Sequence, residues 1–173
     1  MGAQTLVITE APDQGVRVID RADLRIAPNP DLGDAGQPSI AVTGTIAAEG
    51  EGDRYVISLR AGEIITLDID FAAGFGSGPQ PGGYKDGFGL DSEVLINDSA
   101  GNLLNVNDDA PVTSGGAGSL VSQDSYLRFT APTDGQYTVV VRGYDTGTPG
   151  YYSTGNYTLN VSVDAASNAT LTD

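Results

Sequence analysis

Residues 156–163 read Asn-Tyr-Thr-Leu-Asn-Val-Ser-Val, and this alternation is the clearest structural signal in the chain. The apolar positions are Tyr157, Leu159, Val161 and Val163. The polar positions between them are Thr158, Asn160 and Ser162. Successive side chains of a strand point to opposite faces, so we expect a β-strand with one buried face and one face in water.

The same alternation recurs along the chain. Further strands are expected at residues 16–19, 54–59, 63–70, 92–97, 125–130 and 136–142. The 24 glycines and 9 prolines fall mainly between these segments, and no amphipathic helix is visible. Short alternating segments separated by turn residues predict an all-β protein, an antiparallel β-sandwich with long functional loops. We expect an N-terminal extension packed on the sandwich (1–39), the sandwich itself (40–164) and a flexible tail (165–173).

The charge balance excludes several classes of protein. The chain carries 23 Asp and Glu against 8 Lys and Arg, a net charge of −15, and has no cysteine and no histidine. Disulfides, thiol catalysis, Cys/His zinc sites and Ser-His-Asp triads are therefore excluded. With Lys85 as its single lysine, the chain is a poor partner for nucleic acid. The acidic excess is either a solvated surface or charge that bound cations neutralise.

Acidic turns point to calcium as the cation. Carboxylates and amides gather between residues 91 and 109, next to glycine and asparagine. Ca²⁺ takes about six to eight oxygen ligands from such groups. In a hairpin arrangement the start of one strand and the loop after its partner meet at one end of the sandwich. The strongest metal-ligand candidates are Asp91, Glu93, Asn107, Asp108, Asp109 and Asp124.

Other acidic residues have two interpretations. Asp68 and Asp70 lie together on the polar face of segment 63–70, whose inward positions are apolar. They are either solvated or, with Asp86, form a second metal site. Asp145 as a ligand would shape the loop that contains it, and Asp53 either coordinates a cation or simply begins a strand.

Turn chemistry explains some of the remaining polar residues. Asp98 and Asn102 flank Ser-Ala-Gly, so we prefer an Asx turn for them. Asp134 precedes Gly135 and is interpreted as a turn residue in the same way.

Two long connections carry the candidates for recognition. Residues 71–90 are rich in glycine, proline and aromatic residues, and residues 143–155 read GYDTGTPGYYSTG. Tyrosine offers a large contact area at low entropic cost, together with a hydroxyl. The ligand-binding candidates are Gly83, Tyr84, Lys85, Tyr144, Tyr151, Tyr152 and Ser153. Tyr55, Tyr137 and Tyr157 instead fit the inward faces of strands, and we expect them in the core.

From about Ile40 to Val163 the chain resembles the bacterial pre-peptidase C-terminal domain family. The matching pieces occur in the family's order: Gly44-Thr-Ile46, Gly52-Asp-Arg-Tyr55, Leu59-Arg-Ala-Gly-Glu63, the stretch from Asp91 to Asp109, the stretch from Asp124 to Val140, and Gly155-Asn-Tyr-Thr-Leu159. This resemblance implies a calcium-binding, jelly-roll-like β-sandwich found beside secreted peptidases and in large surface proteins.

Within that group the chain looks most like the calcium-dependent peptide-binding domain of bacterial RTX adhesins. Its size, its acidic excess and its long Gly/Tyr loops carry this narrower resemblance. The resemblance implies several bound Ca²⁺ ions, an extracellular location on the bacterial cell surface, and a role in attachment and biofilm formation. It also implies a monomer without membrane insertion that binds short peptides at the free C-terminus of target proteins.

A hypothesis for the mechanism follows. A Ca²⁺ ion held by a loop coordinates the terminal carboxylate, and the Gly/Tyr loops contact the preceding side chains. One alternative is a calcium-dependent carbohydrate-binding module, since vicinal hydroxyls also coordinate Ca²⁺. Another is a structural or accessory domain of a secreted protein. An enzyme is the least favoured reading, because Asp91 and Glu93, which could act as acid and base on a glycoside, are better explained as metal ligands.

Overall fold

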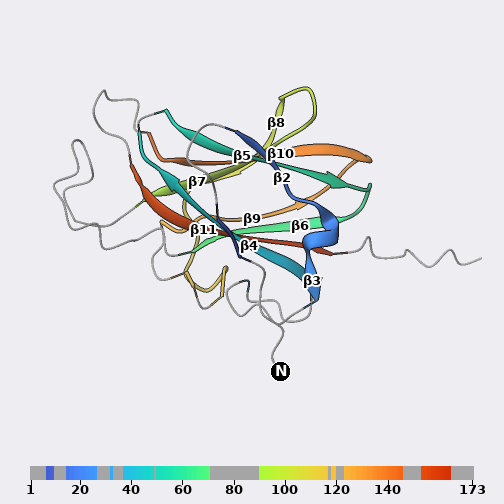
Figure 1. Cartoon of the computed structure of the whole chain (residues 1–173), viewed down its shortest axis with the longest axis horizontal. Helices are drawn as coiled ribbons and strands as arrows, with labels where there is room; N and C mark the ends of the chain where they lie inside the picture. The colour runs from blue at the N-terminus through green and yellow to red at the C-terminus, as the bar shows by residue number, and fades with distance from the viewer. Residues whose placement is uncertain are drawn as a thin grey trace, which may run out of the picture.

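The computed structural model is an all-β protein, as the alternation predicts (Figure 1). It describes residues 7–9, 15–26, 32, 37–48, 50–70, 90–116, 118–119, 123–145 and 153–164. The strands are β1 Val7–Thr9, β2 Val16–Val18, β3 Arg25–Ile26, β4 Pro38–Ile46, β5 Gly52–Leu59, β6 Ile64–Asp70, β7 Ser92–Asn97, β8 Leu103–Asn107, β9 Tyr126–Thr130, β10 Gly135–Gly143 and β11 Gly155–Asp164. A 3₁₀ turn spans Arg21–Asp23. Within the described ranges, no helix is long and apolar enough to cross a membrane.

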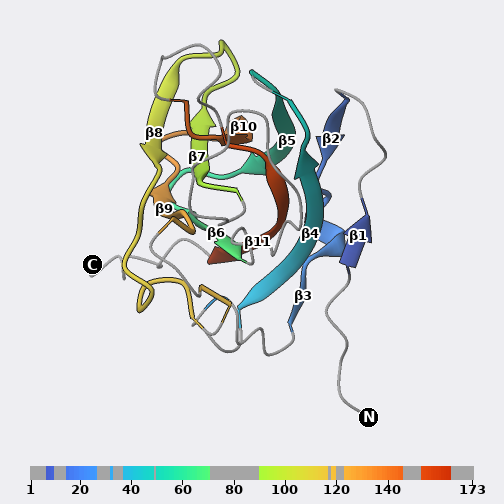
Figure 2. The same cartoon turned by 90° about the vertical axis from the view of Figure 1, so that its left-hand side faces the viewer.

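The strands form two sheets. One has the order β1-β4-β11-β6-β9, with β3 also paired to β4, and the other has the order β2-β5-β10-β7-β8. Figure 2 shows the two sheets curving around a common interior. All pairs are antiparallel except β1 with β4 and β2 with β5, which are parallel. Strand β11, which contains residues 156–163, lies between β4 and β6 at the centre of its sheet.

The described part of residues 1–39 is more closely integrated than a packed extension. Its strands β1, β2 and β3 add backbone hydrogen bonds to β4 and β5, on the flanks of both sheets. Ile19 and Leu24 enter the core, and Arg21 forms an ion pair with Glu63. Edge strands present unpaired backbone groups, and these N-terminal strands satisfy many of them.

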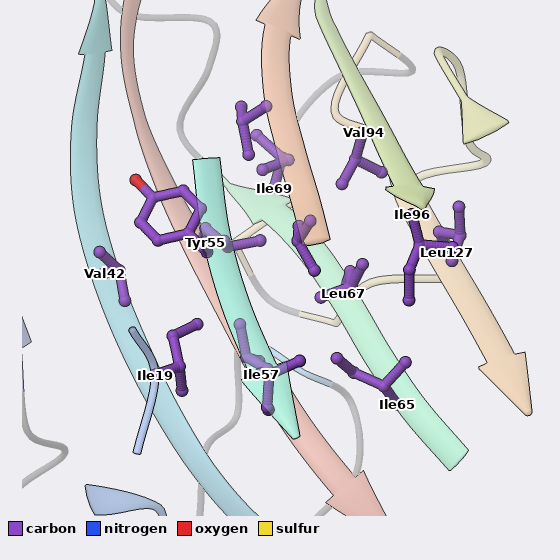
Figure 3. Packing of buried hydrophobic residues seen from close by; sticks show 14 of the residues in the cluster. Ile19, Val42, Tyr55, Ile57, Ile65, Leu67, Ile69, Val94, Ile96 and Leu127 are labelled. Carbon is purple, nitrogen blue, oxygen red and sulfur yellow. The ribbon is translucent and has the colours of Figure 1, made fainter. Parts of the chain in front are cut away.

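The core between the sheets contains the predicted inward faces together with Ile40, Val42 and Ile46 of β4, a strand that was not predicted (Figure 3). Every predicted apolar position of β5, β6, β10 and β11 is buried. The three tyrosines assigned to the core, Tyr55, Tyr137 and Tyr157, are buried there as well. The prediction of an all-β sandwich core is therefore confirmed.

One expectation about the outer faces is wrong. Strand β11 was expected to leave its polar face in water, but Asn160 and Ser162 are 1% exposed. On β6 solvation was one of two interpretations of Asp68 and Asp70, and both are 0% exposed. The cause is a second layer of chain on this face, because Gly115 and Gly118 of the β8–β9 connection lie directly against Asp68 and Asp70. The solvated interpretation of these two aspartates is excluded.

Candidate functional site

The acidic turn, residues Asn107, Asp108 and Asp109, lies where hairpin β7–β8 returns to the end at which β7 begins. Asn107 pairs with Val94, so the turn sits near the start of β7 and near Asp91. Burial, together with the negative charges of Asp109 and Asp108, raises the pKa of Asp91 to about 6. The charges of Asp108 and Asp109 therefore act on the Asp91 carboxyl.

Two serines that the sequence analysis did not single out hold this end of the sandwich together. Ser92 and Ser125 face each other with their hydroxyl oxygens 2.9 Å apart, and the Ser125 backbone N–H donates to the Ser92 hydroxyl at 3.0 Å. The Ser125 hydroxyl also lies 3.1 Å from the Asp108 carbonyl oxygen. Ser92 begins β7 and Ser125 precedes β9, so these bonds tie the two sheets together beneath the acidic turn.

The Asn107 side chain shapes the turn. Its Oδ1 accepts from the Tyr126 backbone N–H at 3.0 Å, and its Nδ2 donates to the Asp109 carbonyl at 2.9 Å. Asn107 was predicted as a metal ligand, and here its amide is engaged by protein groups at both ends. Asp124, a further predicted ligand, is 1% exposed and directly precedes Ser125.

A hollow of about 250 Å³ opens beside this end. Its lining is Ala48, Gly50, Glu51, Glu93, Arg142, Gly143, Tyr144, Asp145 and Ser153. The predicted recognition residues Tyr144 and Ser153 and the predicted ligands Glu93 and Asp145 therefore share one surface. The tertiary structure brings them together from β7, from the end of β10 and from the segment before β11.

Two residues that line the hollow are hydrogen-bonded to Asp91, next to the acidic turn. The Tyr144 N–H donates to the Asp91 carbonyl at 2.8 Å, and the Asp91 N–H donates to the Ser153 hydroxyl at 2.5 Å. The Ser153 N–H in turn donates to the Tyr144 carbonyl at 3.2 Å. The aromatic wall and the acidic region are therefore parts of one hydrogen-bonded unit.

The hollow is also lined by a positively charged side chain, Arg142, which was not among the predicted residues. Arg142 and Glu93 are partners in the β10–β7 register, and their side chains form an ion pair. Glu93 was predicted as a metal ligand, but its carboxylate forms an ion pair with Arg142. The guanidinium is half-exposed, with 49% of its side-chain surface accessible, so it remains able to contact a ligand.

Residues 51–143 match the family of the bacterial pre-peptidase C-terminal domain. This chain belongs to that family. Membership in the pre-peptidase C-terminal domain family makes the chain an accessory or binding domain, of a non-enzymatic kind. No curated protein sequence matches it.

Solved structures similar to this pre-peptidase C-terminal domain are distant. The pre-peptidase C-terminal domain of a collagenase from Bacillus anthracis has 13% identity and a TM-score of 0.46, covering 90% of this chain and 100% of that one. A periplasmic inhibitor of g-type lysozyme from Aeromonas hydrophila has 13% identity and a TM-score of 0.48, covering 86% and 96%. A surface-associated copper-binding protein from Methylomicrobium album BG8 has 11% identity and a TM-score of 0.47, covering 87% and 97%. Similarity at this level transfers no function.

The aspartates outside the acidic turn have distinct environments in this pre-peptidase C-terminal domain. Asp53 is buried and accepts a 2.5 Å hydrogen bond from the Tyr157 hydroxyl, which lies 2.6 Å from the Tyr55 hydroxyl. Asp98 accepts from the backbone N–H groups of Ala100 and Asn102 at 2.9 and 2.8 Å. The Asx turn predicted there is confirmed. Hydrogen bonds to Asn102 are the largest of the causes that lower the pKa of Asp98.

The predicted metal ligands do not gather into one acidic cluster in the described residues. In the described part of the chain, no three or more Asp or Glu side chains form a group that could hold a metal ion. A cation at either acidic region therefore needs amide, hydroxyl, backbone or water oxygens beside one or two carboxylates. The predicted residues Gly83, Tyr84, Lys85, Asp86, Tyr151 and Tyr152 lie outside the described residues.

Proposed function

We propose that this pre-peptidase C-terminal domain is a calcium-dependent binding module of a secreted bacterial surface adhesin, and that it binds short peptides through their free C-terminal carboxylate. One observation carries the proposal. The hollow is lined by Tyr144, Ser153 and Arg142, and Tyr144 and Ser153 are hydrogen-bonded to Asp91. The pKa of the Asp91 carboxyl is raised in part by the charges of Asp108 and Asp109.

Electrostatics supports a cation at this end. A peptide carboxylate is repelled by a chain of net charge −15. A Ca²⁺ ion bound at Asp91 and the acidic turn would remove the repulsion among those carboxylates and attract the ligand's carboxylate. Arg142 offers a second positive group in the same hollow, and Tyr144 offers an aromatic surface for the preceding side chain.

Fluorescent random-sequence tetrapeptides, prepared with a free and with an amidated C-terminus, test this proposal. We expect anisotropy changes with the free-acid pool in calcium, and none in excess EDTA or with the amidated pool. Tyr144→Ala and Arg142→Gln should weaken binding at least tenfold. Arg54→Gln, an exposed arginine on β5, is the matched control and should bind as the unmodified chain does.

Each other outcome points elsewhere. Equal binding of amidated peptides, or full binding in EDTA, overturns the proposal. Binding on a glycan array without peptide binding favours the carbohydrate-binding alternative. A melting temperature that calcium raises, and that no peptide or glycan raises further, would indicate a calcium-stabilised accessory domain. The buried pair Asp68 and Asp70 favours this second function.

A further inference from the structure

Strand β8 (Leu103–Asn107) exposes apolar side chains at the margin of the five-stranded sheet. In the described part of the chain it pairs with β7 alone, and Figure 2 shows it on the outer side of the molecule. Leu103, Leu104 and Val106 are 55%, 38% and 41% exposed. They are three of the six large apolar residues exposed in the described ranges, so the exposure is concentrated on this strand. Apolar side chains gathered in this way mark an interaction surface more often than scattered ones do.

The backbone of this edge is open as well. Ile96 pairs with Asn105 and Asn97 pairs with Leu103, so Leu104 between them has no partner on β7. The Val106 N–H donates to Asn105 Oδ1 at 2.9 Å, a side chain of its own strand. Strand β9 does not close the edge, because at the nearest point the Tyr126 N–H donates to the Asn107 side chain at 3.0 Å. Backbone groups on such an edge can form a ladder with another segment.

The edge also lacks the charges that usually protect one. Residues 99–107 contain no charged side chain, although the whole chain carries a net charge of −15. The edge strands β2 and β9, in contrast, each contain an arginine, Arg17 and Arg128. Natural proteins place charges, prolines or bulges on edge strands to prevent unwanted pairing. An uncharged apolar edge on so acidic a chain therefore favours a docking surface.

The size of the edge favours a short extended segment over a second copy of the domain. Five residues of strand extend about 17 Å. A stable contact between two folded proteins buries about 1,200–2,000 Å², far more than pairing along five residues provides. Two chains of net charge −15 also repel each other. A peptide that adds as a strand needs only the backbone ladder and contacts for alternate side chains.

Carboxylates at both ends of β8 define the charge of that segment. Asp98 lies in the hairpin before the strand, and the exposed Asp108 and Asp109 follow it directly. Hydrogen bonds to Asn102 are the largest of the causes that lower the pKa of Asp98, so this carboxyl stays ionised at neutral pH. The complementary peptide has an apolar centre of about five residues with a lysine or arginine at each end.

We propose that the free edge of β8 is a second peptide-binding site, which adds an extended segment with an apolar centre and basic ends as a further strand of the sheet. The site lies outside the hollow and requires neither calcium nor a free C-terminus. It therefore recognises internal segments of a partner protein, which the proposed carboxylate-binding site does not.

Capped peptides test the site in excess EDTA, where carboxylate capture through calcium cannot contribute. The probe is Lys-Val-Thr-Val-Thr-Val-Lys, labelled with fluorescein at its N-terminus and amidated at its C-terminus. Its anisotropy should rise on titration with the full chain. A matched peptide with glutamate in place of both lysines should bind at least tenfold more weakly, because the ends of β8 then repel it.

Backbone methylation tests whether the peptide adds as a strand. One edge bonds alternate residues of an added strand, so N-methylation of the valines or of the threonines removes different donors. One of these two peptides should lose at least tenfold in affinity, and the other should bind within threefold of the probe. Hydrogen exchange at the Leu104 and Val106 amides should slow at least fivefold in the complex.

A charged residue on the edge should block the site. Leu104→Lys changes an exposed residue that has no partner on β7, and it should weaken binding of the probe at least tenfold. Val16→Lys places the same charge on edge strand β2, where Val16 is 58% exposed, and it should bind within twofold of the unmodified chain.

Several results would overturn this site. They are equal binding of the lysine and glutamate peptides, equal effects of the two methylated peptides, and full binding by Leu104→Lys. A dimer in sedimentation that Leu104→Lys dissociates would assign the edge to a second copy instead. Loss of free-acid tetrapeptide binding in calcium, with capped-peptide binding retained, would overturn the proposed function and leave this site standing.

Discussion

The acidic turn (Asn107, Asp108 and Asp109) and the buried pair (Asp68 and Asp70) use the same side-chain chemistry in opposite environments. Asp108 and Asp109 are exposed, whereas Asp68 and Asp70 are fully buried. In the turn, water screens the charges, and the raised pKa of the half-buried Asp91 comes first from its burial and then from the charges of Asp109 and Asp108. In the buried pair there is no water to screen them, so the fold itself must supply compensation. The density of acidic residues along the sequence therefore identifies the acidic turn, where the charges are exposed to water. It does not identify the buried pair, where each charge costs more free energy.

The largest effect is expected at the buried pair. Asn160→Leu removes the amide that donates to Asp70 at 2.6 Å. Removing this one donor from the buried carboxylate should lower the free energy of unfolding by about 3 kcal/mol. Urea denaturation measures the change. The control Asn105→Leu, on exposed β8, should change it by no more than about 0.5 kcal/mol; equal effects would mean that burial does not distinguish the two regions.

A third buried carboxylate provides a comparison with known donors. Burial raises the pKa of the Tyr157 phenol above its usual range, so its hydroxyl stays protonated and donates to Asp53. Tyr157→Phe should therefore cost about 2 kcal/mol in the free energy of unfolding, with or without calcium. A calcium-dependent cost would instead assign a cation to Asp53. Tyr137→Phe, which removes a hydroxyl bonded to the Thr133 carbonyl rather than to a carboxylate, serves as the control.

The pH dependence of stability should expose the strain at Asp91. Its folded-state pKa of about 6 lies above the ordinary value of 3.8 for aspartate, so the folded state binds the extra proton between these values. In EDTA, stability should rise as pH falls from about 6 to about 4, by about 1 kcal/mol once solvent screening is discounted. Thermal denaturation over this range should show the slope for the unmodified chain and a smaller one for Asp91→Asn. Identical slopes would contradict the assignment.

The smallest effect is expected in the acidic turn itself. Asp108→Asn/Asp109→Asn, measured in EDTA, should change the free energy of unfolding by no more than about 0.5 kcal/mol, in the stabilising direction, because exposed like charges are removed. The same variant should also bring the pKa of Asp91 closer to its ordinary value, which NMR titration of that carboxyl can follow. A marked loss of stability in EDTA would show that the turn carries structural hydrogen bonds through these side chains.

Local patterns predicted the inward faces well. Alternation alone identified the core-facing apolar positions of β5, β6, β10 and β11, because a period of two is imposed by the strand backbone. The Asx turn at Asp98 also followed from neighbouring residues, since its hydrogen bonds span only four positions. By contrast, the parallel pairing of β1 with β4 and of β2 with β5 joins segments far apart in the sequence, and alternation within one strand does not specify its partner.

The candidate site was only partly predictable for the same reason. Tyr144, Ser153, Asp145 and Glu93 were singled out by residue type, but their shared hollow and the ion pair of Glu93 with Arg142 depend on the β10–β7 register. Ser92, Ser125, Ser119 and Asn160 carry no distinctive local signal and were missed. Their roles come from hydrogen bonds to groups on other segments of the chain.

By itself the sequence determined the all-β class, the faces that form the core, and the acidic, histidine-free and cysteine-free chemistry that leaves oxygen ligands as the means of binding a metal. Only the tertiary structure decided which acidic residues are in water. The polar face of β6 is buried because the distant segment around Gly115 and Gly118 packs on it. Strand periodicity specifies the direction in which a side chain points, and only the packing of remote segments specifies whether it meets water there.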